Sequence, residues 1–152
     1  MFEIERKFLI NTELWKPTGT GTKIKQGYLS VDPERVVRVR IAGEKAFLTI
    51  KGKPAGIVRT ELEYEIPQNE AEVLLKMCLN FPIEKTRFKE RLGNLTWEID
   101  VFEGENKGLI VAEVELTSEN QNVDLPEWIG EEVSSDFRYY NSWLSENPFT
   151  KW

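Results

Sequence analysis

The sequence predicts an α+β protein dominated by antiparallel sheet, with about eight strands and two helices. Apolar and polar residues alternate over most of the chain, which is the period of a strand with one buried face. Turn sequences such as Asp32-Pro33-Glu34 and Asn106-Lys107-Gly108 separate these segments, and only two segments have helical spacing. At 152 residues the chain fits one domain, which we expect to span residues 1–152.

The expected strands are joined mainly by short connections. A Thr-, Gly- and Pro-rich stretch follows the first strand, a turn at Ala42–Lys45 closes one hairpin, and a turn near Gly93-Asn94 closes another. In chain order the expected strands are Glu3–Ile10, Lys23–Ser30, Val36–Ile41, Ala46–Lys51, Val58–Ile66, Ile83–Lys89, Leu95–Phe102 and Leu109–Leu116.

Two helices are expected outside these strands. Pro67 ends the fifth strand, and residues Asn69–Leu79 follow with Asn69 as the expected N-cap and acidic residues in the first turn. A second helix is expected from Asp136 to about Leu144, after a corner at Pro126–Gly130.

Composition restricts the chemistry. The chain has no histidine, which excludes imidazole-activated nucleophiles and zinc sites with histidine ligands. The formal charge of −6 argues against a nucleic-acid partner. No apolar run is as long as a membrane span, and no signal peptide is expected at the N-terminus, so we expect no membrane partner. The single cysteine, Cys78, is expected to pack on the first helix and fits a cytoplasmic location.

The first strand carries the clearest chemical pattern. With a period of two residues, Glu3, Glu5 and Lys7 share one face, while Ile4 and Phe8 lie on the other. Neighbouring carboxylates repel each other unless a cation lies between them, so the pattern indicates a metal site beside a phosphate-binding lysine. A solvated edge strand is the alternative.

The same arrangement recurs along the chain, because single faces of later strands carry pairs of one charge sign. These pairs are Lys23/Lys25, Arg38/Arg40, Glu61/Glu63, Lys85/Arg87 and Glu113/Glu115, with Lys51, Glu98 and Asp100 in addition. Such faces suit a closed eight-stranded antiparallel barrel whose charged interior is a tunnel for a polyanion and a metal. A sandwich with these faces in water is the alternative. A tunnel would turn apolar residues outward, so we expect a homodimer, or another partner, to cover them.

These residues resemble a known family, the triphosphate tunnel metalloenzymes or CYTH superfamily, and in particular its short bacterial tripolyphosphatase-like members. Glu3-Ile4-Glu5-Arg6-Lys7 is similar to the family's ExExK signature. Further similar motifs follow in the family's order: Gln26-Gly27-Tyr28-Leu29, Val37-Arg38-Val39-Arg40, Leu48-Thr49-Ile50-Lys51-Gly52, Glu61-Leu62-Glu63, Lys85-Thr86-Arg87, Glu98-Ile99-Asp100 and Ala112-Glu113-Val114-Glu115-Leu116.

The resemblance implies a tunnel that binds a linear triphosphate and Mg²⁺, or Mn²⁺, as cofactor. It implies triphosphate contacts from Lys7, Lys25, Arg38, Arg40, Lys51, Lys85 and Arg87. It implies metal contacts, direct or through water, from Glu3, Glu5, Asp100, Glu113 and Glu115, and acidic tunnel positions at Glu61 and Glu63.

Lys7 and Tyr28 are the candidate catalytic residues. Strict alternation puts Tyr28 on the face away from Lys25, and a bulge at Gly27 would turn it inward; a structural tyrosine in the barrel wall is the alternative. Arg138 either reaches the tunnel mouth and the triphosphate or is a solvated residue.

The expected reaction is hydrolysis of inorganic tripolyphosphate to pyrophosphate and phosphate. The resemblance leaves open an adenylate cyclase of class IV type, or a thiamine or nucleoside triphosphatase. A polyphosphate-binding module without catalysis is the third alternative.

Overall fold

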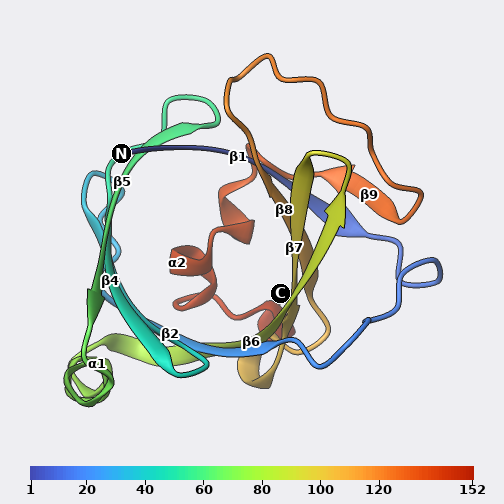
Figure 1. Ribbon diagram of the computed structural model, residues 1–152. Coiled ribbons are helices and arrows are strands. Elements are labelled where there is room, and N and C mark those ends of the chain that lie inside the picture. The colour runs from blue at the N-terminus through green and yellow to red at the C-terminus, as the bar shows by residue number, and fades with distance from the viewer.

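The computed structural model describes residues 1–152, and its strands form one closed ring (Figure 1). The strand order is β5-β4-β3-β2-β6-β7-β8-β1-β9, every pairing is antiparallel, and a β1–β5 pairing closes the ring. The strands are β1 (Phe2–Ile10), β2 (Thr22–Ser30), β3 (Val36–Ala42), β4 (Lys45–Lys51), β5 (Val58–Ile66), β6 (Leu79–Leu92), β7 (Leu95–Phe102), β8 (Ile110–Glu115) and β9 (Ile129–Glu132).

The predicted eight-stranded antiparallel barrel is confirmed, and the sandwich alternative is wrong. β1 makes the closure because its first residues pair with β5 and its later residues pair with β8. The ninth strand, β9, was not predicted. It pairs with the end of β1 where the sequence suggested only a corner at Pro126–Gly130.

The first helix is shorter than predicted. α1 spans Gln68–Lys76, and its N-cap is Pro67 with no capping side chain, so the expectation of a helix over Asn69–Leu79 capped by Asn69 is wrong. The C-terminal end differs because Leu79 already begins β6, and Asn80 adopts a positive φ of 58° there. The pairing of β6 with β2 therefore contains an irregularity, between the partners of Gln26 and Tyr28.

The predicted second helix is divided into short pieces. The 3₁₀ helix η2 (Phe137–Tyr139) begins after Asp136, whose side chain accepts a hydrogen bond from the Arg138 backbone. Tyr140 then adopts an extended conformation and separates η2 from the one-turn helix α2 (Asn141–Leu144). The remaining 3₁₀ turns are η1 (Gly104–Asn106) and η3 (Phe149–Lys151). In the view down the barrel, α2 lies within the ring of strands (Figure 1).

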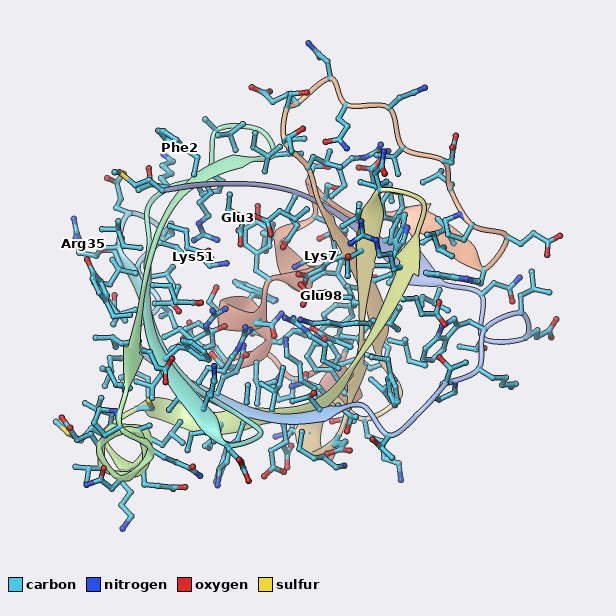
Figure 2. All side chains as sticks on the ribbon, viewed as in Figure 1. Phe2, Glu3, Lys7, Arg35, Lys51 and Glu98 are labelled. Carbon is cyan, nitrogen blue, oxygen red and sulfur yellow. The ribbon has the colours of Figure 1, made fainter.

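The two faces of the sheet differ in chemistry as the sequence predicts. Figure 2 shows Glu3, Lys7 and Lys51 inside the ring, whereas Phe2 and Arg35 lie outside it. The apolar outer face is covered partly by α1, and elsewhere by loop residues such as Trp15, which packs edge to face on Phe88. No helix in the structure has the length and apolar character needed to cross a lipid bilayer.

Candidate active site

A cavity of about 100 Å³ lies inside the barrel, and its lining is mainly charged. Bases outnumber acids, so the cavity favours an anion although the whole chain carries a formal charge of −6. The basic residues are Lys7, Arg38, Arg40, Lys51, Arg59, Lys85 and Arg87, and the acidic residues are Glu3, Glu5 and Glu113.

Strand alternation positions most of these side chains. On β1, Glu3, Glu5 and Lys7 line the cavity, while Arg6 between them points away and pairs with Glu132 of β9 at 2.7 Å. The structure thus brings together ten of the residues that the sequence singled out. They are Glu3, Glu5, Lys7, Tyr28, Arg38, Arg40, Lys51, Lys85, Arg87 and Glu113.

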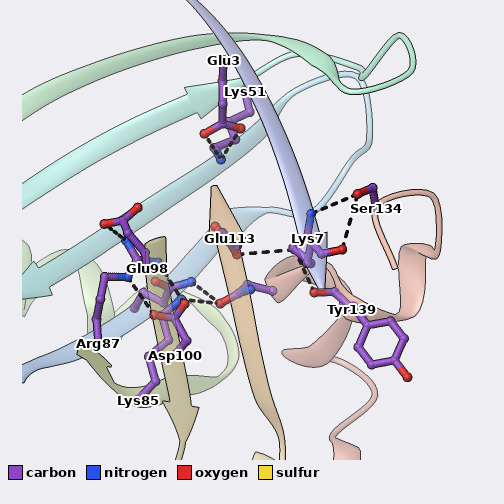
Figure 3. A network of polar contacts seen from close by, with 12 residues as sticks. Glu3, Lys7, Lys51, Lys85, Arg87, Glu98, Asp100, Glu113, Ser134 and Tyr139 are labelled. Carbon is purple, nitrogen blue, oxygen red and sulfur yellow. Dashed lines mark hydrogen bonds and ion pairs between the residues drawn. The ribbon is translucent and has the colours of Figure 1, made fainter. Parts of the chain in front are cut away.

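Two other predicted acidic residues, Glu61 and Glu63, do not line the cavity but form ion pairs with its bases. Lys51 forms ion pairs with Glu3 at 3.1 Å and with Glu61 at 3.3 Å, and the first of these is drawn in Figure 3. Arg38 lies 3.4 Å from Glu63, which also accepts a hydrogen bond from Thr49 at 2.8 Å. Glu115 is opposite Glu5 in the β1–β8 ladder but is exposed.

Two predicted triphosphate ligands lie outside the cavity. Lys25 is exposed on the outer face of β2 and lines a different cleft, beside Asn80 and the C-terminal residues. The sequence placed Lys25 on the inner face because it forms a same-sign pair with Lys23, but Lys23 is also exposed and pairs with Glu103 at 2.6 Å. Arg138 is exposed and hydrogen-bonded to Asp136 at 2.6 Å, away from the cavity.

Because Lys25 faces outward, Tyr28 faces inward by ordinary alternation. It is 3% exposed, lines the cavity and accepts a hydrogen bond at 3.0 Å from Gln26 Nε2, on the same face. Gly27 between them faces outward, where a Cβ would lie 2.8 Å from the sulfur of Cys78. The glycine allows α1 to pack closely on β2, and it is not needed to turn Tyr28 inward.

Asp100 holds two of the cavity bases. Its two carboxylate oxygens accept hydrogen bonds from Lys85 Nζ at 2.7 Å and from Arg87 Nε and Nη2 at 2.7 and 2.9 Å (Figure 3). Burial alone would raise the pKa of Asp100, but the adjacent Arg87 and Lys85 lower it well below its usual range. Since these bases contact both oxygens, Asp100 acts in the structure as their anchor, and its role as a metal ligand stays a prediction.

The two buried lysines differ in their protonation. Burial lowers the pKa of Lys85 to about 7, and the attraction of Asp100 offsets this effect only in part. Burial also disfavours the charged form of Lys7, but Glu113 and Glu5 outweigh it and raise the pKa of Lys7. Lys7 Nζ lies 3.6 Å from Glu113 and donates to the Tyr139 carbonyl at 3.1 Å (Figure 3). Lys7 therefore keeps its charge at neutral pH, whereas burial shifts Lys85 towards its neutral form.

The acidic side of the cavity has the chemistry of a hard-metal site. Burial and the charges of Glu113 and Glu3 raise the pKa of Glu5 well above its usual value, and burial and Glu61 raise that of Glu3 against the pull of Lys51. A cation between these carboxylates would relieve their repulsion. No group of three or more such side chains is arranged to hold a metal ion. One or two carboxylates are nevertheless enough for Mg²⁺, which keeps waters and takes substrate phosphates as its other ligands.

One buried donor among the cavity bases has room for an anionic partner. Arg38 is 7% exposed, and its Nε is buried with no hydrogen-bond partner. A buried guanidinium donor without a partner is costly, and a phosphate oxygen in the cavity would satisfy it.

Several residues of the site were not found from the sequence. Gln26 faces inward, and the alternation that orients Tyr28 would have located it. Ser134, Tyr140, Asn141 and Ser142 also line the cavity, and they come from the C-terminal segment. No local pattern marks them, because their place depends on how the chain end folds into the barrel.

Comparison with known proteins gives a consistent result. A family model described as the CYTH domain matches residues 1–142. A protein from Acetivibrio thermocellus called inorganic triphosphatase is 47% identical over 148 residues, which cover 97% of this chain and 95% of that protein. An inorganic triphosphatase from Nitrosomonas europaea is 38% identical over 152 residues, with 95% of this chain and 97% of that protein covered.

Solved structures share the fold. A crystal structure of an inorganic triphosphatase superposes with a TM-score of 0.66 at 35% identity, and the match covers 94% of this chain and 93% of that one. A putative adenylate cyclase from Bacillus halodurans has a TM-score of 0.58 at 19% identity, with 77% and 81% of the two chains covered. At that identity the likeness concerns the fold alone.

Proposed function

This chain belongs to the CYTH domain family, and from that premise we propose that it is a divalent-cation-dependent hydrolase of inorganic tripolyphosphate. The products are pyrophosphate and phosphate. The observation that carries the proposal is the cavity itself, where bases converge from five strands on a space of about 100 Å³ and a buried arginine donor has no partner. We take residues 1–152 as one such domain.

The bases hold the substrate. Three phosphoryl groups in line carry several negative charges, and guanidinium and ammonium groups on the walls neutralise them through charge-assisted hydrogen bonds. We assign this role to Lys7, Arg38, Arg40, Lys51, Lys85 and Arg87, and add Arg59, which lines the same cavity from the start of β5.

The acids Glu3, Glu5 and Glu113 are the proposed metal ligands, with Glu115 acting through water. A divalent cation bound there, Mg²⁺ or in its place Mn²⁺, would neutralise developing charge and polarise the terminal phosphoryl group. The preference for Mg²⁺ follows from the all-oxygen donor set.

Lys85 Nζ donates to Asp100 and to Asn141, which hold it as an ammonium group, so we keep Lys85 among the triphosphate contacts. Lys7 stays protonated, so we assign it to stabilising the charge of the transition state. Tyr28 lies at the cavity wall and is fixed by Gln26, which suits orientation of the substrate or water.

The test is phosphate release from tripolyphosphate, with ATP, thiamine triphosphate and pyrophosphate in parallel, each with and without Mg²⁺. We expect Mg²⁺-dependent hydrolysis that is fastest on tripolyphosphate. Cyclic AMP and pyrophosphate from ATP would instead identify a cyclase. Tight binding of tripolyphosphate without turnover in Mg²⁺, Mn²⁺ or Co²⁺ would identify a binding module.

We also propose that the protein is a cytoplasmic homodimer. Support for the dimer comes from apolar side chains on the outer face that α1 leaves uncovered, among them Leu62 and Tyr64 of β5 at 36% and 53% exposure. Sedimentation equilibrium measures the assembly, and a monomer at micromolar concentration would contradict the proposal.

A further inference from the structure

The C-terminal segment, residues 134–142, contributes to the cavity as much as a strand does. Ser134, Tyr140, Asn141 and Ser142 all line it, and the Tyr139 carbonyl accepts the hydrogen bond of Lys7. The segment is held there by apolar packing, because Tyr139 and Leu144 belong to a cluster of buried side chains at that end of the barrel. The chain end thus meets both buried lysines of the site.

Asn141 is the member of this segment with the most specific contacts. Its Oδ1 accepts hydrogen bonds from Lys85 Nζ at 2.9 Å and from Gln26 Nε2 at 3.0 Å. Because both partners are hydrogen-bond donors, the side-chain atom of Asn141 that they contact is the amide oxygen. Together with Asp100 at 2.7 Å, Asn141 therefore fixes the Lys85 ammonium from two sides.

Gln26 links Asn141 to Arg40. It is fully buried on β2, and its Oε1 accepts a hydrogen bond from Arg40 Nε at 2.9 Å. Arg40 is surrounded by like charges, since Arg38 and Arg87 both lower its pKa in addition to the effect of burial. A neutral acceptor holds the guanidinium in this repulsive surrounding without adding a negative charge.

We propose that Asn141 and Gln26 are a pair of positioning residues that hold Lys85 and Arg40 in place for the triphosphate. The inference rests on the proposed function. Amides suit the role better than carboxylates, because they accept hydrogen bonds without repelling the phosphates. Lysine has a long, flexible side chain, and a displacement of about 1 Å at a reacting centre can lower a rate about 100-fold.

The test separates turnover from binding in steady-state kinetics on tripolyphosphate. Asn141→Leu keeps the size of the side chain and removes the acceptor, so we expect kcat to fall about 100-fold, and KM to rise as well because Lys85 and Arg40 also hold the substrate. Asn141→Asp keeps the acceptor and adds a charge, so kcat should stay within about tenfold of wild type while KM rises, because the carboxylate repels the substrate. The control is Asn147→Leu, in the same part of the chain but outside the cavity, which should match wild type.

The pairing has its own test. Gln26→Met removes the acceptor for Arg40 and the donor to Asn141 at similar size, and should also lower kcat. If the two residues act together, the double variant should lose less than the product of the two single losses. Should Asn141→Leu not fold, Gln26→Met decides the question, because a folded Gln26→Met with kcat within about twofold of wild type would overturn the proposal. Folded Asn141→Leu with kcat within about twofold of wild type, or losses that multiply, would overturn the proposal.

A crystal structure of Asn141→Leu tests the positioning without any activity. We expect Lys85 Nζ to leave its place beside Asp100, or Arg40 to adopt another rotamer. Unchanged positions of both side chains would overturn the inference. If wild type fails to hydrolyse any triphosphate, the proposed function fails, but this structure still decides whether Asn141 fixes the two bases.

Discussion

Replacing Asp100 with Asn tests the electrostatics of the barrel interior. The carboxylate is 1% exposed and accepts three hydrogen bonds, one from Lys85 and two from Arg87. Asn keeps the shape but removes the charge, so it leaves two buried cations without their common partner. Breaking a buried ion pair by removing one member costs about 3–5 kcal/mol of unfolding free energy.

The cost of this substitution should depend on pH. In wild type the pKa of Lys85 is about 7, and loss of the carboxylate lowers it further, because Asp100 is the main group that raises it. At a pH between the Lys85 pKa of the folded variant and that of folded wild type, Lys85 is protonated in wild type and neutral in Asp100→Asn. The unfolding free energies of wild type and Asp100→Asn must then approach each other as pH rises between these two pKa values. We therefore expect a larger loss of stability near pH 5 than near pH 8, which is about one unit above the Lys85 pKa of wild type.

Urea unfolding at pH 5, 6, 7 and 8 measures the effect. The matched control is Glu103→Gln, which weakens the exposed pair with Lys23 and should cost less than about 1 kcal/mol at every pH. A loss of less than about 1 kcal/mol for Asp100→Asn, or a loss that grows from pH 5 to pH 8, would refute the reasoning.

Four further substitutions test separate parts of the account. Arg38→Met removes the buried donor that lacks a partner, and should raise the KM for tripolyphosphate about tenfold or more with no loss of thermal stability; an unchanged KM would contradict its assignment. Glu5→Gln should increase the Mg²⁺ concentration needed for half-maximal turnover, and should raise the melting temperature without metal, because it removes a carboxylate that its neighbours repel; an unaltered metal requirement would place the cation elsewhere. Lys25→Ala should leave kcat and KM unchanged, since Lys25 lies outside the barrel. Gly27→Ala should cost about 1–3 kcal/mol in urea unfolding, because the new Cβ would lie 2.8 Å from the Cys78 sulfur.

The barrel could be predicted because its sequence pattern has a direct physical cause. On β1 the inward residues Glu3, Glu5 and Lys7 alternate with outward residues that are apolar except for Arg6, and later strands show the same alternation. A charged inner face and an apolar outer face leave few arrangements other than a closed, ion-lined ring.

The predictions that failed concern side chains whose positions depend on contacts between residues far apart in the chain. Same-sign pairing placed Lys25 inside, yet a pair of lysines on a solvated face is also stable when each can reach water or a partner such as Glu103. Gln26 was quoted only as part of a family motif and was given no role, although it contacts three cavity residues, Arg40, Tyr28 and Asn141. Asn141 enters the site because contacts distant in sequence, among them the apolar packing of Tyr139 and Leu144, hold the chain end in the barrel.

The most direct test of the central claim is a crystal structure of Glu5→Gln with tripolyphosphate and Mg²⁺. We predict a linear triphosphate inside the ring of strands, with an oxygen at hydrogen-bond distance from Arg38 Nε and other contacts to Arg40, Lys51 and Lys85. Tripolyphosphate bound in the outer cleft beside Lys25, with the barrel interior empty of phosphate, would contradict the account.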